Sequence, residues 1–301
     1  MSMKIESLIG RVRNLRTPSP TVIRLLSVLD APDPDMDEVI STVNQDAVLS
    51  AKLLGVCNSA YFGLAQPISS VDQGVLHLGF NEIHRLLMAL GFGEIVGAKV
   101  PCYDMEAGTL WQHSLVTALL APRVIASART IQMETSVAYT AGLLHDIGKL
   151  VIGQLLDDKG REQIHQHVEN QGVSLVEAER AVLGADHAGI GACLLQQWRI
   201  PKVIVDAVEH HHEPPENVVG LSHVVHVADA MAHQSGASPG WGSFAITVHE
   251  SALTALRLTS ANVEDLTISA LDAQEKAAQQ QAKGAPMRNA RSSGHAVPAL
   301  F

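Results

Sequence analysis

Residues 141–149 read Ala-Gly-Leu-Leu-His-Asp-Ile-Gly-Lys and are the most informative stretch of the chain. They place a histidine, an aspartate and a lysine at the end of an apolar run with a helical pattern. His145 offers an imidazole nitrogen and Asp146 a carboxylate oxygen, and this pair of donors suits a borderline divalent ion. Burying both groups in an apolar setting would be costly without a partner. The stretch therefore predicts a metal site on a helical scaffold.

The rest of the chain supplies the other ligands that such a site needs. They are His113, His187, His211, His212 and Asp229. The resulting order of His, His-Asp, His, His-His and Asp resembles that of the HD superfamily of metal-dependent phosphohydrolases. This resemblance implies a divalent ion (Fe, Mn, Ni, Zn or Mg), for which His113 and Asp229 complete the ligand set of the His-Asp pair.

A narrower resemblance covers most of the chain from about residue 15 and rests on segments outside the His-Asp pair. The segments read Asn-Gln-Asp-Ala-Val-Leu-Ser-Ala-Lys-Leu-Leu at 44–54, Cys-Asn-Ser-Ala-Tyr-Phe-Gly at 57–63 and Ile-Ser-Ser-Val-Asp-Gln-Gly-Val-Leu-His-Leu-Gly at 68–79. They resemble the HDOD domain, the HD-related output domain of bacterial signalling proteins. Because HDOD proteins are generally regarded as regulatory modules, the resemblance implies a signalling output or scaffold module.

A second metal ion is a separate question. His187, His211 and His212 match the positions that supply a second ion in the HD-GYP branch, the cyclic di-GMP phosphodiesterases. The chain departs from that branch in two places. Glu213-Pro-Pro-Glu follows the paired histidines where a Gly-Tyr-Pro signature would stand, and Thr109 occupies the position of an acidic ligand one turn before the first histidine. One ion is therefore favoured over two.

The chain has 15 histidines, so most of them need an ordinary explanation. His210 makes the paired histidines a triple, and we align the pair with His211 and His212, which leaves His210 turned away from the site. The remaining histidines are interpreted as hydrogen-bonded core or surface residues. They are His77, His84, His165, His167, His223, His226, His233, His249 and His295.

Composition limits the classes of partner. Of the 301 residues, 47% are hydrophobic and only 4% are aromatic, which favours a substantial core of packed helices over a sheet. The formal charge of −10 argues against a broad phosphate-backbone footprint, so nucleic acid is not an expected partner. Arg11, Arg13 and Arg16 form a local basic group, interpreted as a solvated helix face.

Cysteine usage and hydropathy indicate the compartment. Cys57, Cys102 and Cys193 are widely separated and have neither a disulfide framework nor a paired metal spacing. The first residues lack the apolar core of a signal peptide, and no apolar segment approaches roughly 18 charge-free residues. We therefore expect a cytoplasmic protein that has no membrane partner.

Helix punctuation divides the chain into two helical parts and a tail. Within residues 1–100, proline and glycine alternate with short segments of helical period. Residues 101–273 carry the candidate ligands, and Asp186 is expected to cap the helix that His187 begins. Residues 274–301 lose the apolar period, which predicts a frayed helix followed by a disordered tail. The predicted fold is all-α: an N-terminal bundle of short helices packed on an HD-superfamily helical domain.

Two functions from different classes remain open. The favoured one is a signalling output or scaffold module that contacts a signalling protein and retains a metal-binding HD site. The alternative is a metal-dependent phosphohydrolase that acts on a nucleotide or cyclic dinucleotide. In that case Asp146 and Lys149 are the expected catalytic side chains: Asp146 holds the ion that activates a water, and Lys149 offsets phosphate charge. Lys149 could equally cap helix carbonyls.

Overall fold

The described part of the computed structural model comprises residues 2–12, 15–29, 34–59, 62–64, 66–237, 240 and 248–284. Within these ranges the secondary structure is helical, apart from one isolated bridge between Val100 and Met105. The all-α prediction is therefore confirmed. Arg13, His295 and residues 285–301, on which sequence-based interpretations were placed, lie outside the described residues.

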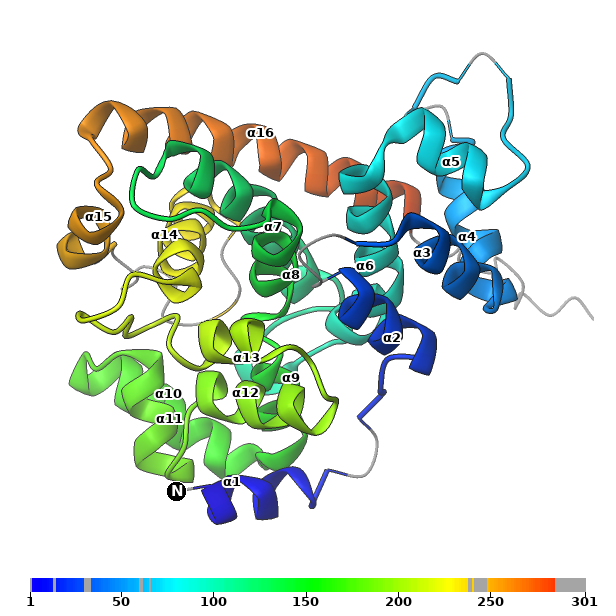
Figure 1. Cartoon of the computed structure of the whole chain (residues 1–301). Coiled ribbons are helices and arrows are strands. Elements are labelled where there is room, and N and C mark those ends of the chain that lie inside the picture. Colours follow the sequence, from blue (N-terminus) through cyan, green and yellow to red (C-terminus); the bar gives the residue numbers. More distant parts are fainter. Residues whose placement is uncertain are drawn as a thin grey trace, which may run out of the picture.

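The described residues of the N-terminal third form six helices. They are α1 (Ser2–Ile9), α2 (Pro20–Leu29), α3 (Met36–Asn44), α4 (Ala47–Cys57), α5 (Val71–Leu78) and α6 (Phe80–Val96). Helices α2 to α6 contact one another and form a bundle on one side of the molecule (Figure 1). Helix α1 packs instead against α12, in the other half of the chain.

The remainder of the chain forms the larger half. Its elements are the 3-10 helix η1 (Pro101–Tyr103), α7 (Thr109–Ser127), α8 (Thr135–Leu144), α9 (Gly148–Leu155), α10 (Asp158–Gln171), α11 (Leu175–Leu183), α12 (His187–Gln197), α13 (Lys202–Glu209), α14 (Leu221–Gln234), α15 (Glu250–Leu256) and α16 (Ser260–Gly284). Helices α7, α8 and α14 pack together at its centre, and α16 runs along α7 (Figure 1).

Helix α16 continues past residue 274, where the apolar period of the sequence fades. Ala270, Ala273 and Ala277 are buried along it, and its main contacts are with α7 and α14. Alanine has the highest helix propensity and a small side chain, so it allows close helix packing without a strong hydropathy signal. Small buried residues therefore continue this helix past residue 274, and the helix ends at Gly284.

Two glycines allow the backbones around the His-Asp pair to approach closely. A Cβ atom on Gly142 of α8 would lie 2.9 Å from the Cα of Ala118 in α7. A Cβ atom on Gly148, at the start of α9, would lie only 1.9 Å from the carbonyl oxygen of His187 in α12. The turn that carries His145 and Asp146 is thereby held between α7 and α12.

Candidate metal centre

Six of the candidate ligands meet in the middle of the larger half, although they are far apart in sequence. His113 lies on α7, His145 ends α8, Asp146 follows it, His187 begins α12, His211 follows α13 and Asp229 lies on α14. Each of the six is at most 2% exposed. Asp186 caps α12 by accepting from the backbone N–H of Gly189 at 2.8 Å, as expected from the sequence, and so orients His187.

The first cluster gathers around His113. Its Nε2 lies 3.0 Å from Asp229 Oδ1 and 3.2 Å from His145 Nε2. His145 Nε2 is in turn 3.5 Å from Asp229 Oδ1 and 3.5 Å from Asp146 Oδ2. Donor atoms that share one tetrahedral ion with bonds of about 2.0–2.2 Å lie about 3.3 Å apart. Each of these four pair distances is close to the separation of neighbouring ligands on one ion.

The second cluster gathers around His187. Its Nε2 lies 3.2 Å from Asp146 Oδ1 and 2.8 Å from His212 Nε2. The potential ligand atoms of Asp146, His187, His211 and His212 all lie within 4.8 Å of one another. Because the two oxygens of Asp146 face different clusters, this carboxylate lies between them and has the position of a bridging ligand.

The paired-histidine alignment agrees with the side-chain orientations. His211 is buried and groups with both clusters, while His212 approaches His187. His210 is half-buried, and its Nδ1 lies 3.0 Å from the backbone oxygen of Asp206 in the preceding turn. His210 is therefore engaged away from the clusters.

Hydrogen bonds on the outer nitrogens set the tautomers of the cluster histidines. The Nδ1 atoms of His113, His145 and His211 donate to the carbonyl oxygens of Ala237, Gly142 and Val208, at 2.7, 2.8 and 2.7 Å. A carbonyl oxygen only accepts, so the proton of each neutral imidazole is on Nδ1 and the Nε2 lone pair faces inward. Metal-binding histidines are commonly oriented in this way.

Several inward atoms have close neighbours but no hydrogen bond. Within the described residues, Asp146 Oδ1, Asp229 Oδ1 and His211 Nε2 are buried and make none. The 3.0 Å approach of His113 to Asp229 and the 3.2 Å approach of His187 to Asp146 are thus contacts without hydrogen-bond alignment. A buried polar atom left in this state costs about 1–3 kcal/mol. Coordination of a cation would satisfy all three atoms.

Electrostatics keep the two carboxylates ionised. Burial opposes ionisation of Asp146, but Lys149 and His145 hold the pKa of its carboxyl well below the usual range. Burial likewise opposes ionisation of Asp229, whereas His233 and His113 hold its pKa well below the usual range. Both side chains therefore present anionic oxygens, the form in which a carboxylate binds a metal ion.

The pKa values of His211 and His187 in the second cluster are shifted in opposite directions. Burial, together with His145 and His187, lowers the pKa of His211 to about 3, so this imidazole is neutral. Burial opposes protonation of His187, but the Glu179 carboxylate raises its pKa to about 9. The negative charge of Glu179 therefore stabilises a positive charge at His187. The neutral imidazole of His211 keeps a lone pair for a ligand bond.

Lys149 is part of the cluster's own charge balance. Its Nζ donates to Asp146 Oδ2 at 2.6 Å, and the residue is 3% exposed. The ammonium group therefore neutralises part of the Asp146 charge inside the protein. Helix capping and phosphate binding, the two roles considered for Lys149 from the sequence, stay predictions.

Two residues of the centre were not identified from the sequence. His233, interpreted as an ordinary core or surface histidine, has its Nε2 3.4 Å from Asp229 Oδ1. Glu179 on α11 is fully buried and accepts from the backbone N–H and Nδ1 of His187, at 2.8 and 2.7 Å, and from the Tyr103 hydroxyl at 2.7 Å. The four-residue spacing from Asp229 to His233 was an available signal. For Glu179 the sequence offered none beyond an acid on a helix.

The clusters are largely enclosed by the described residues. A pocket of about 590 Å³ between α1, α12 and α13 reaches His212. Its two basic residues already have acidic partners: Arg180 lies 2.5 Å from Asp186, and Lys202 lies 2.6 Å from Asp206. The pocket therefore approaches the second cluster, but its basic side chains are engaged with acids.

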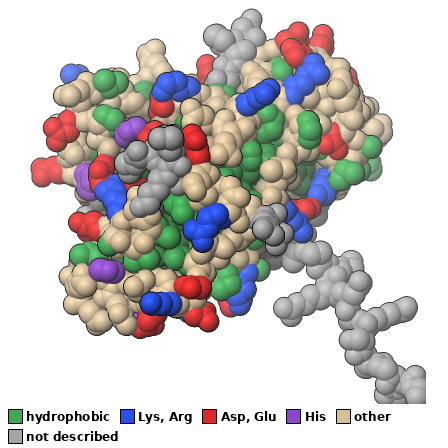
Figure 2. All heavy atoms as spheres, turned by 90° about the horizontal axis from the view of Figure 1, so that it is seen from below, with side chains coloured by type: hydrophobic (Ala, Val, Ile, Leu, Met, Phe, Trp, Pro, Cys, Tyr) green, Lys and Arg blue, Asp and Glu red, His purple; other side chains and the backbone are tan. Residues whose placement is uncertain are grey.

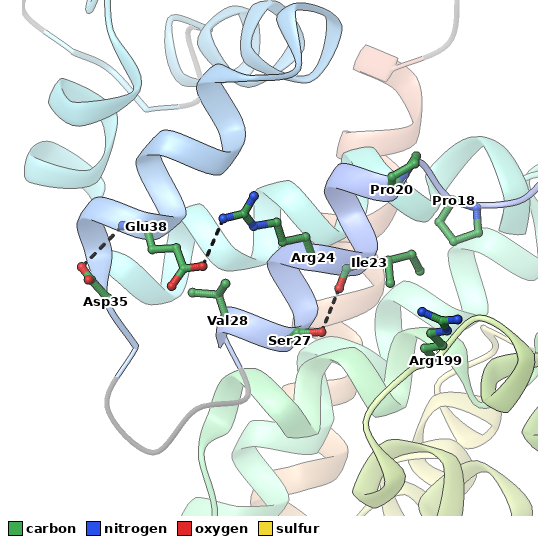
Figure 3. Close-up of a pocket in the computed structure, with 9 residues that line it drawn as sticks. All are labelled: Pro18, Pro20, Ile23, Arg24, Ser27, Val28, Asp35, Glu38 and Arg199. Atoms are coloured by element: carbon green, nitrogen blue, oxygen red, sulfur yellow. Dashed lines mark hydrogen bonds and ion pairs between the residues drawn. The ribbon is translucent and has the colours of Figure 1, made fainter.

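A second hollow lies at the junction of the two halves. It is a groove of about 750 Å³ between α2, the start of α3 and Arg199 in the turn before α13 (Figure 3). Within it Arg24 points toward Glu38, at 3.3 Å, and Asp35 caps α3. No candidate metal ligand is among the described residues that line this groove.

The described surface has mixed charge. On the face shown in Figure 2, Lys and Arg side chains are scattered among Asp and Glu side chains, without a continuous basic band among the described residues. None of the described helices combines the length and the apolar character needed to cross a bilayer. The three cysteines are free thiols.

The family model of the HDOD domain matches residues 15–214. This match covers more than half of the chain, which therefore belongs to the HDOD family. The sequence resemblance is thus confirmed, and the candidate ligands His113, His145, Asp146, His187 and the paired histidines lie inside the matched region. Asp229 follows it.

Two solved structures share the fold. A proposed signal transduction protein from Marinobacter aquaeolei VT8 superposes with a TM-score of 0.74 at 21% identity, over 93% of this chain and 64% of that one. A proposed phosphohydrolase from Shewanella amazonensis SB2B superposes with a TM-score of 0.67 at 22% identity, over 91% of this chain and 98% of that one. At these identities the likeness is one of fold alone.

Curated relatives are longer proteins. An uncharacterized protein from Treponema pallidum (strain Nichols) is 25% identical over 217 residues, which are 69% of this chain and 40% of the relative. Ribonuclease Y from Thermus thermophilus is 32% identical over 129 residues, 43% of this chain and 17% of that enzyme. The chain therefore corresponds to less than half the length of these relatives.

Proposed function

We propose that this chain is a signalling output module of the HDOD type whose larger half binds a divalent metal ion. The observation that carries the metal part is the contact between His113 and His145. Their Nε2 atoms lie 3.2 Å apart, and the Nδ1 atom of each ring contacts a backbone carbonyl oxygen. When both imidazoles are neutral with the proton on Nδ1, their Nε2 lone pairs face each other, and a cation between them would bind both.

One ion is the proposed occupancy, at the first cluster. His113, His145, Asp146 and Asp229 would hold it there, as their pair distances suggest, and Asp146 would reach a second ion near His187 as a shared ligand. The imidazole donors suit borderline ions such as Fe, Ni or Zn better than Mg or Mn. The ion would join α7, α8 and α14, so its expected contribution is to hold these helices together.

The enclosure of the site supports an output role over catalysis. The first-cluster side chains are buried, and Lys149 is engaged with Asp146. We place the partner surface on the bundle of α2 to α6. Two large apolar side chains are exposed there, Val48 at 65% and Leu76 at 81%. The solved neighbour described as a proposed signal transduction protein is consistent with such a role.

The second candidate function is hydrolysis of a nucleotide or cyclic dinucleotide. The observation in its favour is the pocket of about 590 Å³, which brings solvent close to His212 at the edge of the second cluster. The fold of the proposed phosphohydrolase from Shewanella amazonensis is consistent with this activity. In this function Asp146 would help to hold the ion and Lys149 would offset the charge of the phosphate.

Elemental analysis and a hydrolysis screen on the same preparations distinguish the two functions. The variant is Asp146→Asn, and the matched control is Asp265→Asn, an exposed carboxylate on α16. We expect about one borderline metal ion per chain in the wild-type protein and the control, its loss in Asp146→Asn, and no turnover of cyclic or linear nucleotides. Metal-dependent turnover that disappears in Asp146→Asn would replace the output module by the phosphohydrolase. Wild-type protein that stays metal-free after incubation with Fe, Mn, Ni and Zn would refute the metal site.

A further inference from the structure

His233 lies beside the first cluster on the helix that supplies Asp229. The two residues are one turn apart on α14, and a spacing of four places side chains on one face of a helix. His233 Nε2 is 3.4 Å from Asp229 Oδ1, and its side chain is 3% exposed. Its ring lies 4.5 Å from the ring of His113, measured between centroids. His233 therefore faces the cluster from inside the protein.

The spacing of these atoms is that of ligands. The potential ligand atoms of His113, Asp229 and His233 all lie within 4.8 Å of one another. The individual distances to Asp229 Oδ1, 3.0 Å from His113 and 3.4 Å from His233, bracket the separation of about 3.3 Å between donors on one tetrahedral ion. Asp229 Oδ1 makes no hydrogen bond in the described structure, so the 3.4 Å contact is not one.

Helix α7 has no carboxylate that could complete the ligand set of the ion. Thr109 occupies the position one turn before His113, where the sequence comparison with two-ion enzymes would place an acid. His233 approaches the same histidine from α14. A neutral imidazole at this place would add a nitrogen donor to the ligand set. Asp146 and Asp229 would then be its only negatively charged members.

We propose that His233 is a direct ligand of the metal ion at the first cluster, and that its nitrogen favours borderline ions over Mg²⁺ and Mn²⁺. The proposal rests on metal binding at the His-Asp centre, as proposed above. His233 then shares the ion with His113 and Asp229, the two residues with which it forms a potential ligand group. Imidazole suits Zn, Ni, Cu and Fe, whereas carboxylates and water suit Mg, Ca and Mn.

A Co²⁺ titration tests the contact directly, because the visible absorption of protein-bound Co²⁺ depends on its donor atoms. The variant is His233→Gln, which removes the imidazole and keeps a polar side chain of similar length. The matched control is His223→Gln on the same helix. His223 is buried at 2% exposure and belongs to none of the four potential ligand groups.

We expect His233→Gln to shift the Co²⁺ spectrum and to raise the dissociation constant at least about tenfold, with the control unchanged. Wild-type spectrum and affinity in a folded His233→Gln protein would overturn the ligand role. A weaker affinity with an unchanged spectrum would also overturn it, since His233 would then only position Asp229. If wild-type protein bound no Co²⁺, the metal centre itself would fail, which is a different result.

A ligand exchange covers the case in which His233→Gln does not fold. In His233→Glu a carboxylate replaces the imidazole, so the ratio of the Mn²⁺ to the Zn²⁺ dissociation constant should fall at least about tenfold. A negative charge that is merely nearby would strengthen both ions alike and leave the ratio unchanged. An unchanged ratio would therefore refute direct ligation. Both constants are measured by competition with a chromophoric chelator.

Discussion

Replacing Gly148 by alanine should weaken the fold at the point where the candidate site is assembled. The new Cβ would lie 1.9 Å from the carbonyl oxygen of His187 and 2.7 Å from the backbone nitrogen of Gly191. Both are backbone atoms of α12 and cannot rotate away. Ordinary contact begins near 3.5 Å, so α9 and α12 would have to separate by about 1 Å or more.

The expected cost follows from two opposing terms. Overpacking of this kind costs up to about 3 kcal/mol, and the higher helix propensity of alanine returns about 1 kcal/mol. The free energy of unfolding should therefore fall by about 2 kcal/mol, equivalent to roughly 4–8 °C in Tm. His187 would move with α12 away from Asp146, so metal affinity should fall as well.

Urea unfolding followed by circular dichroism measures the first effect, and a Zn²⁺ titration measures the second. The control is Gly55→Ala in α4, where no atom lies within 4 Å of the added Cβ apart from the adjacent residues and the backbone of its own helix. This variant should be as stable as the wild type or gain up to about 1 kcal/mol. A Gly148→Ala protein that is as stable as Gly55→Ala would show that α9 and α12 do not pack backbone to backbone.

Three further predictions concern the metal, the support of His187 and pH. Treatment with EDTA should lower the Tm of wild-type protein but leave that of Asp146→Asn unchanged, because the ion stabilises only a chain that binds it; equal shifts in a thermal denaturation series would contradict this. Glu179→Gln removes the carboxylate that His187 Nδ1 contacts at 2.7 Å and that raises the pKa of His187 to about 9, so this pKa should fall, and an unchanged value in an NMR titration would argue against that support. Burial and the adjacent Arg85 charge lower the pKa of His84 from 6.5 to about 4, so the unfolded chain takes up a proton first as the pH falls. The free energy of unfolding should therefore decrease between pH 6.5 and 4 by up to about 3 kcal/mol more in wild-type protein than in His84→Gln, and parallel pH profiles of the two in urea unfolding would rule out this contribution.

The sequence alone determined the local structure and the family. Helix periods separated by proline and glycine predicted an all-α fold, and Asp186 was recognised as the cap that orients His187. Both signals act within a few residues, so they are readable without any tertiary contact. The order of the histidines and aspartates indicated the HD-type ligands, and the HDOD segments identified the family.

Only the tertiary structure decided how these groups meet. It placed His233 beside Asp229 and His113, set Glu179 against His187 across two helices, and directed the two oxygens of Asp146 toward different clusters. It also packed α1 on α12, away from the other N-terminal helices. These contacts join residues of distant helices whose approach depends on side-chain volume and on glycines that let backbones touch. A single sequence contains no local signal for such an approach, because it is the sum of packing over the whole core.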